Sequence, residues 1–190
     1  MKTTWAWLGD HLAVDFANTI KVVDNRTIEL IGSIEEFHDW HEAEPADLPT
    51  VDLTSESLRD LRNLRDCALR LLRAACDDRT LPQADVATIN ETIEISGTLR
   101  LLGSATGTSR LQSASEGGFD ALAGLLAAAV VDLLAREDLA NIAVCSAPSC
   151  GQFFHRARPN QVWCSPGCGN RARVDRHRHR RMNATGMARR

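Results

Sequence analysis

The stretch CSAPSCGQFFHRARPNQVWCSPGC, residues 145–168, decides the fold of the C-terminal part of this chain. It carries four cysteines, Cys145, Cys150, Cys164 and Cys168, in the spacing C-x4-C-x13-C-x3-C. Each close pair holds two sulfurs on one side of a turn, and the longer intervening segment lets the two turns face each other. Four thiolates suit Zn²⁺, because this borderline-soft ion accepts a closed tetrahedron of sulfur ligands. The spacing therefore predicts a structural zinc site.

The segments around the cysteines predict a treble-clef-like finger. A proline and two serines between the first two ligands favour a tight knuckle. Segments 152–155 and 161–163 are expected to pair as a hairpin that turns at residues 158–160. The terminal helix is expected to begin within the last cysteine pair. Because so small a unit depends on its metal, its core is minimal and aromatic: Phe153, Phe154 and Trp163.

The formal charge of −3 conceals a division of the chain into two parts. Residues 145–190 hold ten arginines and one aspartate, a net charge of +9, whereas the rest holds 12 basic and 24 acidic residues. A zinc ion with four thiolates adds about −2, which leaves the finger strongly basic. Segments of opposite charge indicate two separate functions.

The segment after the last cysteine reads GNRARVDRHRHRR, residues 169–181, and only Ala172 and Val174 in it suit burial. Such a helix is solvated or bound to a partner, and we predict that it contacts nucleic acid, mainly through phosphates. The predicted contacts are Arg171, Arg173, Arg176, Arg178, Arg180 and Arg181. Double-stranded DNA is favoured because no aromatic residue follows Trp163 to stack on bases. Two alternatives stay open, a solubilising tail and a tail that pairs with the acidic part of the chain.

The first 140 residues predict a helix-rich domain with a small sheet. Helices are expected at 33–43, 54–77, 82–97 and 119–136, the last one nearly all apolar and central. In the second of these, leucines form the buried face and arginines the other faces. Short strands are expected at 27–31, 99–102 and 110–113, and segment 11–22 fits a strand or a short helix. The fold class is therefore α+β, with an N-terminal domain over 1–140 and a zinc finger with a basic helix over 141–190.

The chain shows no signal peptide, and its longest apolar run, residues 121–131, is too short to span a bilayer. We therefore expect a cytoplasmic protein without a membrane partner. Thiols stay reduced in that compartment, which favours metal binding over disulfides. Cys67 and Cys76 are expected to be small core residues.

Two motifs resemble known families. The segment WCSPGCGNR, residues 163–171, resembles the CGNR zinc-finger family, which is named for the tetrapeptide found here at 168–171. The segment LAVDFANT, residues 12–19, is similar to the LDxxNT motif of the ABATE domain, with Val14 in place of leucine. Together the two domains would cover nearly the whole chain. The resemblance implies zinc bound by the four cysteines and a DNA-binding role in stress-induced bacterial transcription regulators, without enzymatic activity.

The resemblance also singles out individual residues. Asn170 joins the nucleic-acid site as a member of the CGNR motif. Asp15, Asn18 and Thr19 match the ABATE motif, where they either line a ligand pocket or make buried hydrogen bonds that shape the fold.

The leading hypothesis is a transcription regulator. Its N-terminal domain would sense a small-molecule effector or a partner, or form a homodimer, and its finger would bind DNA. The alternatives are an RNA-binding zinc module, an adaptor between proteins with a purely structural zinc, and an enzyme that uses the N-terminal pocket. The enzyme is disfavoured because the sequence has no Gly-rich phosphate loop, no H-E-x-x-H and no nucleophile elbow.

Overall fold

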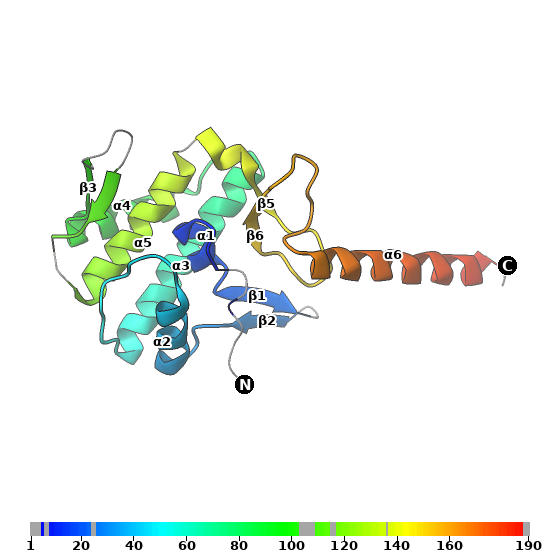
Figure 1. The fold of residues 1–190 in the computed structure, drawn as a ribbon, viewed down its shortest axis with the longest axis horizontal. Helices are drawn as coiled ribbons and strands as arrows, with labels where there is room; N and C mark the ends of the chain where they lie inside the picture. The colour runs from blue at the N-terminus through cyan, green and yellow to red at the C-terminus, as the bar shows by residue number, and fades with distance from the viewer. Residues whose placement is uncertain are drawn as a thin grey trace.

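The computed structural model of the protein describes residues 5, 8–23, 26–102, 109–114, 117–135 and 137–187. A helical body is joined to a small finger, and one long helix projects from the finger away from the body (Figure 1). The described strands form three two-stranded antiparallel sheets. These features confirm the predicted α+β class. No helix within the described ranges is long and apolar enough to cross a membrane.

The helices of the body match the predicted segments. They are α2 (Ile34–Ala43), α3 (Ser55–Cys76), α4 (Gln83–Ser96) and α5 (Gly118–Leu134). Ser33 and Glu36 form the capping box at the start of α2, and Thr54 caps α3 through its side chain. Gly97 ends α4 in the left-handed conformation. The starts of α2 and α3 and the end of α4 could be predicted well because a local cap sets each of them.

Helix α5 lies at the centre of the body, as its apolar sequence predicts. It packs against α4, α3 and the short helix α1 (Leu12–Ala17), and residues 121–124 and 126–130 are buried. Segment 11–22, for which the sequence allowed a strand or a short helix, contains both, because α1 is followed by strand β1 (Ile20–Val23). Residues 13–17 are all buried, so α1 forms part of the core.

Two hairpins complete the body. Strand β1 pairs with β2 (Arg26–Glu29), and β3 (Leu99–Leu102) pairs with β4 (Ser109–Gln112). The second strand of each hairpin begins one residue earlier than predicted. Residues 103–108, which connect β3 to β4, lie outside the described residues.

The prediction that segments 152–155 and 161–163 pair as a hairpin within the finger is wrong. Strand β6 (Phe153–His155) pairs with β5 (Ile142–Val144), which follows the 3-10 helix η1 (Glu137–Asn141), and residues 161–163 form no strand. The knuckle between the first two cysteines is itself the connection, closed where Cys145 N–H donates to the Gln152 carbonyl at 2.8 Å. Gly151 allows this tight return because its φ is +78°. Residues 161–163 lie alongside the knuckle instead, where Ser146 N–H donates to the Val162 carbonyl.

The aromatic core predicted for the finger is divided between two cores. Phe153 packs in the core of the body, whereas Phe154 packs with the cysteines, and Trp163 lies partly buried beside them. Successive side chains of a strand point to opposite faces, so β6 contributes one phenylalanine to each core. The finger therefore shares a hydrophobic surface with the body.

Candidate metal centre and its basic helix

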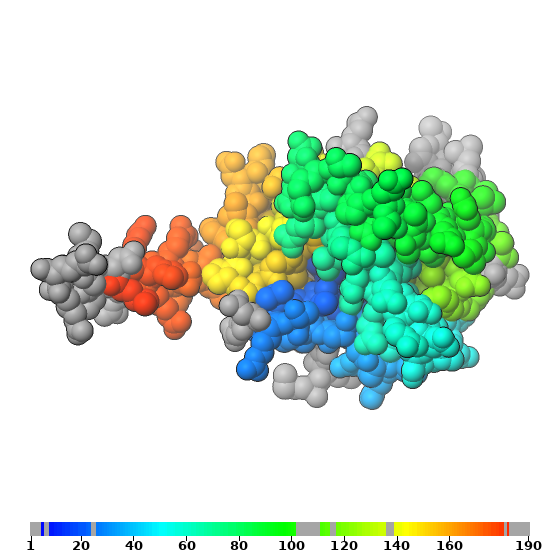
Figure 2. All heavy atoms as spheres, turned by 180° about the vertical axis from the view of Figure 1, so that it is seen from behind, coloured from blue at the N-terminus to red at the C-terminus, as the bar shows by residue number. Residues whose placement is uncertain are grey.

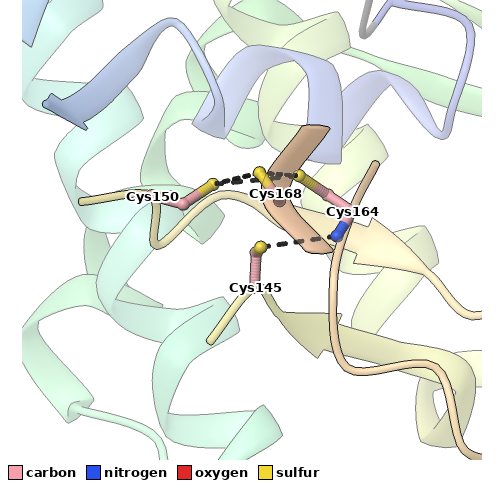
Figure 3. Close-up of side chains that lie close together, drawn as sticks. All are labelled: Cys145, Cys150, Cys164 and Cys168. Carbon is pink, nitrogen blue, oxygen red and sulfur yellow. Dashed lines mark hydrogen bonds between the residues drawn. The ribbon is translucent and has the colours of Figure 1, made fainter. Parts of the chain in front are cut away.

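The four predicted cysteines converge in the structure. Their sulfurs all lie within 4.8 Å of one another, and three of the separations are 3.8 Å (Cys150–Cys164), 3.4 Å (Cys164–Cys168) and 3.7 Å (Cys168–Cys150) (Figure 3). A tetrahedral zinc ion with Zn–S bonds of about 2.3 Å places its sulfurs about 3.8 Å apart. The donor set and its spacing therefore fit Zn²⁺.

Local structure holds each sulfur in place. Cys145 and Cys150 lie at the two ends of the knuckle, whereas Cys168 lies in the first turn of α6 (Pro166–Met187). Ser165 caps that helix by accepting from Cys168 N–H at 3.2 Å, and Cys164 N–H donates to the Cys145 sulfur at 3.4 Å. Backbone N–H groups at a helix start favour negative charge, so this geometry stabilises thiolates.

The thiols cannot all ionise without a positive charge among them. Hydrogen bonds from Cys150 and Cys164 lower the pKa of Cys145. The same contact with Cys145 raises the pKa of Cys164, and burial adds to the effect. A bound dication removes this conflict, because its charge stabilises every thiolate at once. Four thiolates around Zn²⁺ still leave a net charge of about −2.

Arg171 lies against the metal centre. Its Nη2 donates to the Cys168 sulfur at 3.0 Å, so its positive charge offsets part of the negative charge of the thiolates. Asn170, the preceding residue of the CGNR motif, accepts from Nη1 of Arg173 at 2.7 Å and orients that arginine. The sequence predicted both motif residues as nucleic-acid contacts, and the structure gives each an interaction within the finger.

Trp163 connects the finger to its helix. A Cβ atom at Gly169 would lie 3.3 Å from the indole ring, which is a tight contact, so glycine lets the ring pack against α6. The guanidinium of Arg176 lies over the same ring, 5.9 Å from its centroid. This cation–π contact orients the Arg176 side chain back toward the finger.

The outer part of α6 projects into solvent (Figures 1 and 2). Arg173, Arg178 and Arg180 are exposed, whereas the side chain of Arg181 lies outside the described residues. Among the side chains that the structure describes, the one contact of α6 between a carboxylate and a basic side chain is internal, between His179 and Asp175 at 3.6 Å. The alternative in which this helix pairs with the acidic domain therefore finds no support in the described residues.

Asn18 of the ABATE-like motif joins the body to the finger. Its Nδ2 donates to the Phe153 carbonyl at 2.9 Å, and Phe153 N–H donates back to its Oδ1 at 2.9 Å. Asp10 forms a second link, because its carboxylate accepts from the backbone N–H of His155 at 3.0 Å and contacts the imidazole ring. Both links end on β6, so the body determines where this strand lies.

Thr19 and Asp15 make interactions within the body. The Thr19 hydroxyl donates to the Phe16 carbonyl and accepts from Arg65 Nη1 at 3.3 Å. Asp15 Oδ2 accepts from Gly9 N–H at 2.8 Å, whereas its buried Oδ1 has no hydrogen-bond partner among the described residues. A cavity of about 740 Å³ between the body and the finger is lined by Asn18 but by neither Asp15 nor Thr19. Asp15 and Thr19 therefore do not line this cavity with Asn18.

Replacing Asp15 by asparagine should change how stability depends on pH. Burial, with smaller contributions from Glu44 and Asp10, raises the pKa of Asp15 to about 7. An aspartate in the unfolded chain ionises near pH 4, so the unfolded state binds fewer protons above that pH and stability falls as pH rises from about 4 to 7. Asparagine does not ionise, so the variant avoids this loss. Between pH 5 and pH 8, the free energy of unfolding of Asp15→Asn should therefore rise by on the order of 2 kcal/mol relative to that of the parent. Urea unfolding at both pH values measures this change, and an unchanged difference between the two proteins would contradict it.

Arg65 is a buried polar residue that the sequence pattern missed. It was expected on an outer face of its helix, but its side chain is only 2% exposed and forms a two-bond contact with the Glu29 carboxylate at 2.7 and 2.8 Å. The ion pair attaches the β1–β2 hairpin to α3. The sequence gives one weak indication of this burial, because Arg65 is positioned next to the leucine face of its helix. Periodicity alone does not distinguish such a position from the exposed ones.

A helical α+β body that is joined through its N-terminal motif to a four-cysteine finger defines a two-part zinc-finger protein. Comparison with protein-family models identifies the families of its two parts. The ABATE family, described as "Putative stress-induced transcription regulator", matches residues 10–137, and the CGNR zinc finger matches residues 141–181. The chain therefore belongs to the ABATE family and carries a CGNR zinc finger, as its two motifs indicated. No curated protein matches the chain.

Proposed function

We propose that the protein is a DNA-binding transcription regulator whose zinc finger holds α6 against duplex DNA. The observation that carries this proposal is the placement of α6, an arginine-rich helix that projects from the body and is fixed at its base to the cysteine centre. A helix of this kind fits the major groove, and its arginines fit phosphates and guanine edges. In this proposal Arg173, Arg176, Arg178, Arg180 and Arg181 contact DNA, while Asn170 and Arg171 support them from the finger.

The zinc has a structural role in this proposal. Four thiolates complete the tetrahedron and leave no position for substrate or water, so the finger acts by binding rather than by catalysis. Residues 141–190 form the DNA-binding part. Residues 1–140 form a sensing or dimerisation domain, which responds to a small-molecule effector or partner. The contact between Asn18 and Phe153 supports this division of roles, because a shift of α1 would move β6 of the finger. A homodimer would supply two fingers and a longer target site.

Removing two arginines from α6 tests the proposal. The double variant Arg173→Gln/Arg180→Gln should bind duplex DNA roughly tenfold more weakly, and the slope of log K against log[salt] should become shallower by about 2, because two phosphate contacts are lost. Fluorescence anisotropy of a labelled duplex across a salt series measures both quantities.

The matched control removes the same charge from the body. Arg59 and Arg79 are exposed on the body, so Arg59→Gln/Arg79→Gln should leave the salt slope nearly unchanged. Equal effects of the two double variants would contradict a binding site on α6. Structured RNA that displaces the duplex at lower concentration than unlabelled DNA would favour the RNA-binding alternative.

A further inference from the structure

A basic side chain of the N-terminal body lies at the base of α6. Lys21 of the β1–β2 hairpin and Arg171 of α6 line the same cavity, so the hairpin lies next to the first turn of the helix. Lys21 is half-buried and forms no ion pair with a described residue, and Arg26 on the paired strand is exposed. Glu29, at the far end of the hairpin, is already paired with Arg65. The described part of the hairpin therefore presents positive charge beside α6.

The loop from 156 to 160 presents a second basic group. Arg156 and Arg158 are exposed there, and the finger has no acidic residue between 145 and 174. Figure 1 shows this loop and the β1–β2 hairpin on opposite sides of the base of α6, and the view from behind in Figure 2 shows the same separation. The helix thus leaves the finger between two basic segments that come from distant parts of the sequence.

The order of loop, helix and hairpin is the same as the order of backbone, groove and backbone in a duplex. The major groove is about 12 Å wide and admits one α-helix, and a phosphate backbone runs along each of its edges. Segments that lie on both sides of the helix base therefore meet the two backbones when the helix enters the groove.

We propose that the β1–β2 hairpin and the 156–160 loop grip the two phosphate backbones while α6 occupies the major groove. This inference rests on the proposed function and adds that the N-terminal domain itself contacts DNA. Contacts to phosphates fix orientation but carry no sequence information. The flanking residues Lys21, Arg26, Arg156 and Arg158 should thus strengthen binding equally on all sequences, whereas α6 determines which sequence is preferred.

Two double variants of the full zinc-loaded chain test whether the hairpin and the loop both contact the phosphate backbones. Lys21→Gln/Arg26→Gln and Arg156→Gln/Arg158→Gln should each weaken duplex binding roughly tenfold and make the salt slope shallower by about 2. The loss should be the same on two duplexes of unrelated sequence. Charge-conserving variants, Lys21→Arg/Arg26→Lys and Arg156→Lys/Arg158→Lys, should restore most of the affinity. Zinc content and the circular dichroism spectrum of each variant verify that the finger remains folded.

The outcomes separate this inference from the proposed function. If the α6 variant loses affinity while both flanking variants behave like Arg59→Gln/Arg79→Gln, DNA binding stands and the grip is overturned. If one flanking variant alone matches that control, the two-sided grip is overturned on that side. If the parent chain binds no duplex at low salt, both proposals are overturned together.

Discussion

Replacing Cys168 by serine is expected to lower zinc affinity on the order of a hundredfold or more and to unfold the finger. A structural zinc of this type supplies most of the folding free energy of its unit, and a hydroxyl is a poor substitute for a thiolate. The body should lose stability as well, because Phe153 of the finger packs in the core of the body. Metal analysis of the purified protein and thermal unfolding followed by circular dichroism measure the two effects.

The control for this variant is Cys76→Ser, the same change at a half-buried cysteine outside the metal centre. It should retain one zinc per chain and unfold close to the parent temperature. Full zinc occupancy and an unchanged melting curve in Cys168→Ser would show that this residue is not a ligand.

Replacing Asn18 by alanine should destabilise the protein by about 2–4 kcal/mol. The substitution removes both hydrogen bonds to Phe153 and leaves a buried N–H and a buried carbonyl without partners, at about 1–3 kcal/mol each. The finger should also detach from the body at lower denaturant concentration, since β6 loses one of its two polar links. Urea unfolding gives the free energy, and hydrogen exchange of the β6 amides reports the local effect.

Asn90→Ala is the matched control, because Asn90 lies exposed on α4. It should change stability by less than about 0.5 kcal/mol. An Asn18→Ala protein as stable as this control, with unchanged protection of β6, would contradict the view that the ABATE motif anchors the finger.

The sequence predicts those features that depend on local signals. The zinc ligands were predictable because the short spacing within each cysteine pair indicates that its two sulfurs lie close together. The starts of α2 and α3 and the end of α4 were predictable from capping residues next to each boundary. The position of α6 follows from Ser165 and Pro166, which favour a helix start.

Features that depend on distant contacts were not predictable. The segment at 152–155 was recognisable as a strand, but its partner could not be chosen, because β5 and residues 161–163 are both short and apolar enough to pair with it. Phe153 and Phe154 look equivalent in the sequence, and only the strand alternation and the Asn18 contact direct one of them into the body. Arg65 is buried together with its partner Glu29, which lies 36 residues away on β2 and reaches α3 only in the folded chain.

A chain that ends at residue 144 would lack the proposed DNA-binding part, but it would also lack β6 and expose the core that Phe153 covers. Charge substitutions on the surface avoid this problem, because they leave both hydrophobic cores intact.

The salt dependence of duplex binding by the zinc-loaded full chain tests most directly whether the zinc-anchored helix binds duplex DNA. We expect saturable binding at low salt, with log K falling linearly against log[salt] at a slope of about −3 or steeper. We also expect that a chelator which removes the zinc abolishes this binding. Absence of duplex binding at low salt, or binding that persists unchanged in the zinc-free chain, would contradict the account.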